Sequence, residues 1–414
     1  MSCSVNKMKK KPILLAPVGN WEMLRTAVEA GTDEVYLGIK GINMRDRAVN
    51  FEIAELKKVV EFCHGKNVKV NLTLNTIIFN DELNKIQEIL IHAKEIGIDG
   101  IICWDMAVIA MAHRYSLQVH LSTQASVSNI EAINQYKNQS VKRFILAREC
   151  SLEQIKELVK KSKKIDKNIE IELFIHGAMC VAISGRCFLS QHLYGNETSA
   201  NRGKCIQPCR RSYIIKDPET DKELEVFNNY VMSPKDLCTL PFIEKILDSG
   251  VEVLKIEGRA RSPEYVKKVV EVYRTAIDTY YEKKKLSKIF KNKLVKKLRT
   301  VYNRDFSSGF YLGKPIDEWT NDYGSKATKK KVYIGQIINF YNKLNVAEVK
   351  IETKQLKLKD NILVIGPTTG VIEQKLKTMH GENKKTMKIA KKGDVVGIQL
   401  DKKARKNDKV FVFN

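Results

Sequence analysis

Short apolar runs alternate with longer amphipathic segments from Pro12 to about Pro263. The short runs have the length and composition of buried strands, and the apolar residues of the longer segments recur at helical spacing. Glycine comes directly after the predicted helices 20–30, 53–64 and 82–96, where it can end a helix. Eight strands are predicted in this part of the chain, at residues 13–16, 34–37, 68–73, 100–103, 117–121, 143–146, 169–175 and 251–256.

Eight strand–helix units in this order predict an α/β fold, specifically a (β/α)8 TIM-like barrel. No Gly-x-Gly-x-x-Gly sequence follows the first strand, so an open dinucleotide-binding sheet has less support. In such a barrel the chemistry lies where the strands end, and we expect the polar residues there to form the site. Those that follow the predicted strands are Asn75, Asp105, Gln124, Arg148, Glu149, His176, Glu257 and Arg259.

The seventh and eighth predicted strands are separated by residues 176–250, far more than the usual connection in a strand–helix unit. Because this insertion leaves the end of a strand, we expect it to lie over the barrel mouth. It holds five of the nine cysteines, namely Cys180, Cys187, Cys205, Cys209 and Cys238. We expect no secretion and reduced thiols, so the cluster indicates metal ligands or a catalytic cysteine.

Four thiolates can hold either a zinc ion or an iron–sulfur cluster. The short C-x2-C pairs that are typical of zinc sites are absent, and only Cys205 and Cys209 lie close together in sequence. Iron–sulfur clusters accept the irregular spacing found here. Arg186 and Arg202 flank the thiols and would offset the negative charge of a thiolate-bound cluster. Unligated or catalytic cysteines remain the alternative.

The pattern changes after the eighth strand. A helix at 266–281 completes the barrel, and a very basic helical segment follows at 283–299. Short β runs separated by turns then predict a small all-β barrel domain. These runs are at 332–340, 346–351, 361–365, 395–400 and 410–413. We therefore predict a TIM-like barrel domain at 1–325 and a basic β-barrel domain at 326–414.

The charge is uneven along the chain. The net charge is +24, from 72 Lys and Arg against 48 Asp and Glu. Residues 329–414 alone hold 20 basic and 8 acidic residues, an excess of +12. An even compositional bias would not concentrate charge in this way, so RNA is favoured as a partner over a membrane surface. No apolar run is long enough to span a bilayer, and the apolar run at 12–18 is too short for a signal peptide. A cytoplasmic location is therefore expected.

Several long motifs resemble the signature of the collagenase-like peptidase family U32. They are ELFIHGAMC at 172–180, GRCFLS at 185–190, RGKCIQPCR at 202–210, SPKDLC at 233–238 and LKIEGR at 254–259. The resemblance covers essentially the whole chain. The family is similar to oxygen-independent RNA and quinone hydroxylation proteins, of which the tRNA members make 5-hydroxyuridine at the wobble position with prephenate as the hydroxyl source.

The resemblance also implies a cofactor, because the quinone members carry a 4Fe–4S cluster on four cysteines. By spacing, these four fall on Cys180, Cys187, Cys205 and Cys238, with Cys209 as an alternative ligand. The basic C-terminal domain and the segment 283–299 would then bind tRNA phosphates.

The strand-end residues receive roles in the hydroxylation hypothesis. Tyr36, Asn75 and Gln124 would contact the substrate, with Tyr36 able to stack on a base. Arginines suit the two carboxylates of prephenate, and the candidates are Arg148, Arg186 and Arg259. Proton transfer is assigned to Glu149, His176 and Glu257.

Two other functions remain open. A collagenase-like peptidase would need a metal or a pair such as Cys180 with His176, because neither His-Glu-x-x-His nor Gly-x-Ser-x-Gly occurs. A non-catalytic RNA-binding factor with a structural metal would explain the charge and the cysteines. Such a factor would not explain the polar residues at the strand ends.

Overall fold

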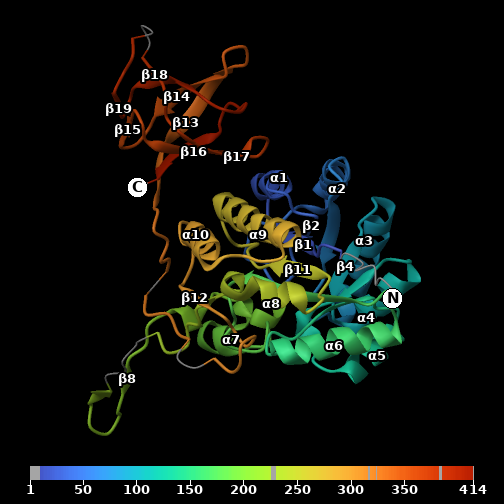
Figure 1. The fold of residues 1–414 in the computed structure, drawn as a ribbon. Coiled ribbons are helices and arrows are strands. Elements are labelled where there is room, and N and C mark those ends of the chain that lie inside the picture. The colour runs from blue at the N-terminus through green and yellow to red at the C-terminus, as the bar shows by residue number, and fades with distance from the viewer. Residues whose placement is uncertain (1–9, 225–229, 316–317, 323, 382–384, 414) are drawn as a thin grey trace, which may run out of the picture.

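The computed structural model describes residues 10–413 except 225–229, 316–317, 323 and 382–384. Eight parallel strands form a closed barrel, because β11 pairs with both β1 and β7 (Figure 1). The strands are β1 (Ile13–Pro17), β2 (Glu34–Gly38), β3 (Lys69–Thr73), β4 (Gly100–Cys103), β5 (Val119–Leu121), β6 (Arg143–Ile145), β7 (Glu170–Gly177) and β11 (Val253–Ile256). The predicted TIM-like barrel is confirmed, and each predicted strand overlaps an observed one.

Helices cover the outside of the barrel, and α1, α4, α5 and α6 begin at a side-chain cap. They are α1 (Trp21–Glu29), α2 (Leu56–His64), α3 (Leu83–Glu95), α4 (Met106–Arg114), α5 (Ile130–Lys137), α6 (Leu152–Ile165), α8 (Ile243–Asp248) and α9 (Pro263–Lys283). The Asn20 side chain accepts a hydrogen bond from the amide of Met23 at the start of α1. Asp105 accepts from the amide of Ala107 in α4, so this strand-end carboxylate is a helix cap.

The barrel interior below the mouth contains a buried network of charges. Arg143 of β6 donates to both carboxylate oxygens of Glu34 at 2.6 and 3.0 Å, and to Glu170 at 2.7 Å. Lys255 of β11 donates to Glu172 of β7 at 2.8 Å. Burial acts to raise the pKa of Glu34, but the hydrogen bonds and charge of Arg143 outweigh it and lower that pKa. Inside the barrel, therefore, opposite charges are paired.

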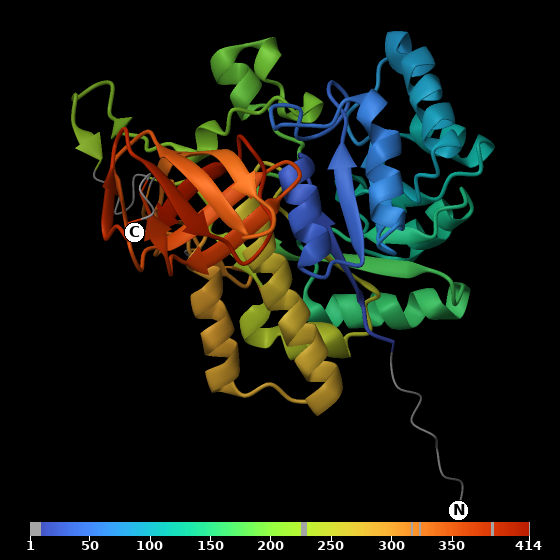
Figure 2. The ribbon, with the colours of Figure 1, turned by 90° about the horizontal axis from the view of Figure 1, so that it is seen from above.

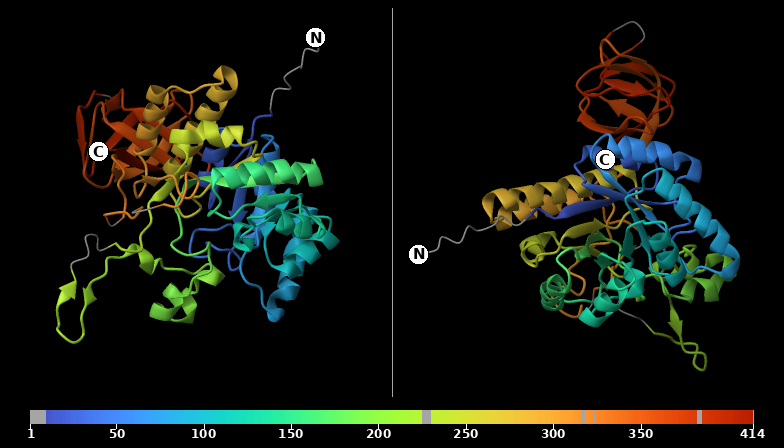
Figure 3. Two further views of the ribbon diagram at one scale, coloured as in Figure 1. Left: turned by 60° about the horizontal axis from the view of Figure 1, so that its bottom comes forward. Right: turned by 90° about the vertical axis from the view of Figure 1, so that its right-hand side faces the viewer.

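The insertion between β7 and β11 lies only partly over the mouth. It contains α7 (Leu189–Tyr194) and the hairpin of β8 (Ile215–Lys216) and β9 (Glu223–Leu224), which projects from the body of the molecule (Figure 3). The chain then returns to the barrel wall, where β10 (Asp236–Cys238) pairs antiparallel with the end of β7. A short strand, β12 (Phe306–Ser307), pairs with β10.

The C-terminal part is an antiparallel β-sheet domain with its own hydrophobic core. Its main sheet has the order β17-β16-β21-β13-β14-β20-β18, and β15 pairs with β19. The strands are β13 (Lys331–Tyr341), β14 (Val346–Ile351), β15 (Gln355–Lys357), β16 (Asn361–Gly366), β17 (Gly370–Lys375), β18 (Met379–His380), β19 (Ile389–Lys391), β20 (Val395–Gln399) and β21 (Lys409–Phe413). The all-β prediction is confirmed. Among the described residues no pairing joins β17 to β18, so the structure shows an antiparallel sheet, and its closure into a barrel stays a prediction. The boundary at 325 and 326 stays a prediction.

The β-sheet domain lies beside the barrel, against α1 and α9 (Figure 2). Arg25 of α1 donates to the carbonyl oxygen of Pro367 at 2.8 Å, and Lys267 of α9 donates to that of Val371 at 3.1 Å. The basic helix α10 (Lys288–Leu298) packs on α9. No helix in the described part of the chain has both the length and the apolar character needed to cross a bilayer.

Candidate functional site

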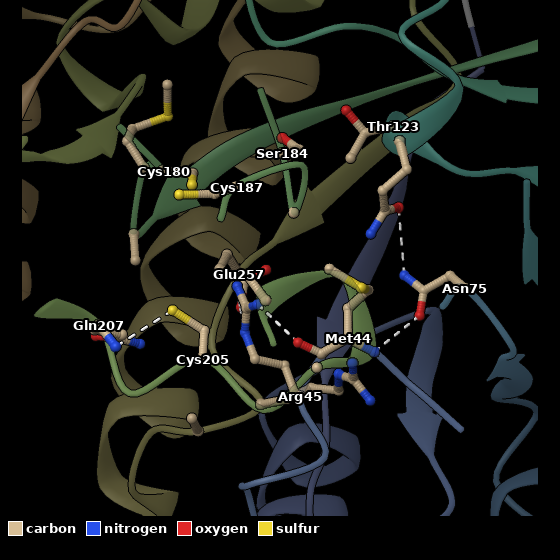
Figure 4. Close-up of a pocket in the computed structure, with 18 of the residues that line it drawn as sticks. Met44, Arg45, Asn75, Thr123, Cys180, Ser184, Cys187, Cys205, Gln207 and Glu257 are labelled. Carbon is tan, nitrogen blue, oxygen red and sulfur yellow. Dashed lines mark hydrogen bonds and ion pairs between the residues drawn. The ribbon is translucent and has the colours of Figure 1, made fainter. Parts of the chain in front are cut away.

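A cavity opens at the barrel mouth between the strand ends, the loop after β2 and the cysteine-bearing insertion. Of the predicted site residues, those that line it are Tyr36, Asn75, Gln124, Arg148, Cys180, Cys187, Cys205, Cys209, Glu257 and Arg259. Figure 4 shows Cys180, Cys187 and Cys205 on one side, with Asn75 and Thr123 on the other. Its lining holds six Arg or Lys residues and Glu257 as the single carboxylate. The cavity is therefore suited to an anion.

Glu257, just past β11, is held between two arginines. Its carboxylate lies 3.2 Å from Arg45 and 3.8 Å from Arg148. Burial acts to raise its pKa, but the nearby charges of Arg45, Arg148 and Arg259 outweigh this and lower the pKa. A carboxylate held in its charged form orients these arginines and is a poor proton donor near neutral pH.

Arg259 is buried close to Glu257, but among the described residues it forms no ion pair. It is 4% exposed, and its recorded hydrogen bond from Nη1 goes to the hydroxyl of Thr73 at 3.1 Å. Gly38 makes this position possible, since a Cβ there would collide with the Arg259 guanidinium. Burial lowers the pKa of Arg259 to about 10, so the side chain is still charged at neutral pH. A buried guanidinium facing a cavity in this way is a receptor for a carboxylate or phosphate.

Tyr36 is less accessible than we predicted. Its ring lies between Lys255 and Arg259, whose cationic groups are 4.5 and 5.9 Å from the ring centroid. Its hydroxyl donates to the carbonyl oxygen of Ile256 at 2.8 Å. The ring is 3% exposed, so the expected role as a stacking surface for a base does not fit. Tyr36 instead supports the two cations.

Asn75 and Gln124 are polar groups on the far wall of the cavity. Asn75 accepts from the amide of Met44 at 3.2 Å and donates to Gln124 at 3.4 Å.

Arg186 does not line this cavity. Its guanidinium lies over the ring of Trp104 and donates to the backbone oxygen of Gln124 at 2.6 Å, which positions that wall.

Four thiols converge on the cavity. Cys180, Cys187 and Cys205 line it together with Cys209. Burial raises the pKa of Cys209 to about 11, and the other three thiols are close enough to add to that shift. Cys238 lies outside the lining, buried in β10 with its sulfur 3.8 Å from the hydroxyl of Tyr273.

The structure thus places Cys209, the alternative ligand, beside the other three thiols and leaves Cys238 apart from them. The reason is the pairing of β10 with β7, which holds Cys238 in the barrel wall.

Tight backbone contacts fix the cysteine loops to the loop after β2. Gly203 has a φ of +77°, and a Cβ there would collide with the carbonyl oxygen of Asn43. A Cβ at Gly185 would likewise meet Met44. Arg210 donates to the backbone oxygens of Met179 and Pro234, the latter at 2.5 Å. Because glycine permits these approaches, the thiols are held in place by the fold.

The donors gathered at this cavity are thiols, the ligand type of both iron–sulfur clusters and zinc ions. In the described part of the chain, no three His, Cys, Asp or Glu side chains are placed to hold one metal ion. An iron–sulfur cluster is several atoms wide and takes its ligands from more widely spaced thiolates. Arg210 lies near Cys209 and supplies the positive charge that such a cluster favours.

Two predicted acid–base residues lie outside this cavity. His176 is buried among the rings of Tyr265, Tyr273 and Phe306, with centroid distances of 6.0, 5.5 and 5.6 Å. Burial lowers its pKa to about 3, so it stays neutral and is not positioned to pair with a cavity thiol. Glu149 is exposed and lines a neighbouring cavity instead. The structure thus supports neither residue as a proton donor at the barrel mouth.

Sequence reasoning missed Lys255 and Arg45. Lys255 lies in β11 two residues before Glu257, so the alternation of a strand could have placed its side chain on the inner face of the barrel. Arg45 comes from the loop after β2 and carries no local signal.

Comparison with known proteins identifies the family. Residues 19–321 match the model of peptidase family U32. A collagenase from Porphyromonas gingivalis is 41% identical over 412 residues, covering 97% of each chain. The tRNA hydroxylation protein P1 of Bacillus subtilis is 33% identical, covering 95% of this chain and 93% of its own. The tRNA hydroxylation protein P of Haemophilus influenzae is 29% identical, covering 92% of this chain and 91% of its own. The chain belongs to peptidase family U32, as its motifs predicted.

Proposed function

We propose that this member of peptidase family U32 is a tRNA hydroxylation enzyme that makes 5-hydroxyuridine at the wobble position without oxygen. The observation that supports this most is the cavity in which four thiols and a surplus of cationic side chains, two of them buried, line the same space. Relatives named tRNA hydroxylation proteins match over more than nine-tenths of the chain. Prephenate, a dicarboxylate, is the proposed co-substrate.

In this proposal Arg259 receives a carboxylate of the co-substrate. Its guanidinium is buried and has no carboxylate of its own among the recorded ion pairs of the described residues. Glu257 holds Arg45 and Arg148 toward the same space, so the positive charge is in place before the ligand arrives. Lys255 adds charge from the floor of the cavity while paired with Glu172.

The proposed cofactor is a 4Fe–4S cluster held by Cys180, Cys187, Cys205 and Cys209. Such a cluster, when bound, can supply electrons or a Lewis-acidic iron. The protein contributes the rigid loops around Gly203 and the nearby cationic side chains. The surface that binds tRNA phosphates is proposed to be the β-sheet domain, with its excess of +12 over residues 329–414, together with α10.

The peptidase alternative has less support from the site. The first cavity is lined by one carboxylate and, among the described residues, by no histidine. A nucleophilic cysteine therefore has no imidazole base beside it. The collagenase name of one relative keeps cleavage of protein as an outcome to be tested.

The cluster is tested by anaerobic purification followed by iron, sulfide and visible absorption measurements. The matched variants are Cys209→Ala and Cys238→Ala. We expect loss of iron and colour in Cys209→Ala and retention in Cys238→Ala. An iron-free wild-type protein would overturn the cluster, and the opposite response of the two variants would restore Cys238 as the ligand.

The reaction is tested by nucleoside analysis of tRNA from a deletion strain. We expect 5-hydroxyuridine to disappear and to return with the wild-type gene. Unchanged tRNA together with the loss of a collagen-cleaving activity would favour the peptidase. Unchanged tRNA with intact RNA binding would favour a non-catalytic factor.

A further inference from the structure

We propose that a second cavity, next to the first, receives the flat ring of a uracil base; this inference rests on the proposed tRNA function. The cavity lies between the cysteine insertion and the segment after β12. Its lining includes Glu149, Val181, Ile183, Lys314, Phe310 and Trp319. Arg148, Met179, Cys180 and Ser184 border both cavities, so a ring held here lies beside the Cys180 thiol and the Arg148 guanidinium.

The second cavity offers the aromatic surface that the first lacks. Trp319 and Phe310 are in its wall, whereas Tyr36 of the first cavity is buried. Trp319 is 37% exposed, and Ile183 nearby is 51% exposed. Exposed aromatic and apolar side chains that line one cavity favour a flat apolar-faced ligand, and single-stranded bases stack on such rings.

Trp319 is held by the fold and not by a free loop. Its backbone forms an antiparallel bridge with Pro234. On either side, Lys235 donates to the carbonyl oxygen of Glu318 at 2.9 Å and Thr320 donates to that of Ser233 at 2.8 Å. Because this bridge fixes the backbone of Trp319, stacking a base on the indole costs little conformational entropy.

The polar groups of this cavity match the edge of uracil. Glu149 and Lys314 are both exposed, and no hydrogen bond or ion pair is recorded for either among the described residues. Uracil presents a ring N–H flanked by two carbonyl oxygens. A carboxylate accepts from the N–H and an ammonium group donates to a carbonyl. Cytosine has a ring nitrogen acceptor at that position, which would face the carboxylate unfavourably.

The two cavities would thus bind different parts of the substrates. The anionic co-substrate occupies the first cavity, and the base occupies the second. Glu149, which does not reach the first cavity, then acts as a specificity residue for the base. An aromatic side chain of a peptide is the competing occupant, and the experiment distinguishes the two.

The test measures binding of anticodon stem-loop RNAs that carry uridine, cytidine or an abasic site at the wobble position. The variants are Trp319→Ala, Trp319→Phe and Glu149→Gln. Leu312→Ala is the matched control, since Leu312 is 53% exposed in the same segment and lines neither cavity. Fluorescence anisotropy of the labelled RNA gives each Kd. A short peptide with a central tryptophan is the second probe.

We expect wild-type protein to bind the uridine RNA about tenfold more tightly than the abasic RNA, as one stacked base provides. That ratio should fall to near one in Trp319→Ala and persist in Trp319→Phe and Leu312→Ala. Glu149→Gln should reduce the preference for uridine over cytidine. A wild-type ratio near one argues against the proposed function itself. A normal wild-type ratio that Trp319→Ala retains overturns only the assignment of this cavity. Peptide binding that depends on Trp319, with RNA binding unaffected, assigns the cavity to a peptide.

Discussion

Inside the barrel the buried charges are paired with opposite charges, whereas at the mouth Arg and Lys side chains outnumber carboxylates. Arg143 pairs with Glu34, and Lys255 pairs with Glu172, and all four residues are on strands. Arg259 is equally buried at the mouth, but its hydrogen-bond partner is a neutral hydroxyl. Charges that are paired inside the barrel need no ligand. A buried cation without an ion pair lowers the stability of the fold unless an anionic ligand binds to it. The difference separates the charges that stabilise the fold from those that the proposed function assigns to a substrate.

Arg143→Met tests the paired region and should have the largest effect. It leaves Glu34 buried without its paired cation, while Glu172 keeps Lys255, and it should lower the free energy of unfolding by about 3–5 kcal/mol. Urea unfolding followed by circular dichroism measures this. The double variant Arg143→Met with Glu34→Gln should recover part of the loss. A single variant within about 1 kcal/mol of wild type would contradict the view that pairing stabilises the interior.

Arg259→Met tests the unpaired region. No carboxylate is left without its recorded partner, so the free energy of unfolding should change by less than about 1 kcal/mol or rise. Binding of prephenate should weaken at least thirtyfold, as expected for losing about 2 kcal/mol of contact to a buried charge. Isothermal titration calorimetry measures the affinity. Instability comparable to that of Arg143→Met would show that Arg259 supports the fold.

Acidification tests the pairing of Glu34 separately. Its folded-state pKa is lowered, so its contribution to stability is present above the unfolded-state pKa, near 4.3, and is lost as pH falls through the folded-state pKa. Urea midpoints of wild type and Glu34→Gln, measured from pH 6 to pH 3, should therefore converge at low pH. One carboxylate can change the free energy of unfolding by at most about 1.4 kcal/mol per pH unit. A constant difference would mean that Glu34 does not titrate as the pairing requires.

Lys268→Ala should give the smallest effect. Lys268 of α9 pairs with Glu373 of β17 at 3.0 Å between the barrel and the β-sheet domain, and both side chains are partly exposed. We expect a loss of about 1 kcal/mol or less that diminishes with added salt. Thermal unfolding at two salt concentrations provides the measurement. A loss as large as that of Arg143→Met would remove the distinction between interior and surface pairs.

The barrel could be predicted because its signals are local. Strand length, helical spacing and the glycines after helices depend on neighbouring residues, and they identified all eight strands. The arrangement of the loops around the barrel mouth depends on contacts between segments that are distant in sequence. Nothing near Cys238 in sequence indicates that β10 pairs with β7, and nothing near Arg45 indicates its approach to Glu257. The strand-end rule therefore identified Glu257 and Arg259, while spacing alone selected Cys238 where the structure assembles Cys209.

For the proposed RNA substrate, the position of the β-sheet domain on α1 and α9 sets a size requirement. The β-sheet domain, which holds an excess of basic residues, lies beside the barrel (Figure 2), and the cavity at the mouth is lined by the strand ends and the cysteine insertion. A short oligonucleotide can occupy one of them at a time, whereas a folded RNA long enough to reach around the flank can touch both. Such a substrate gains avidity from a second attachment that a fragment cannot make. The distance between the two surfaces would then favour a whole folded RNA over a fragment, independently of its base sequence.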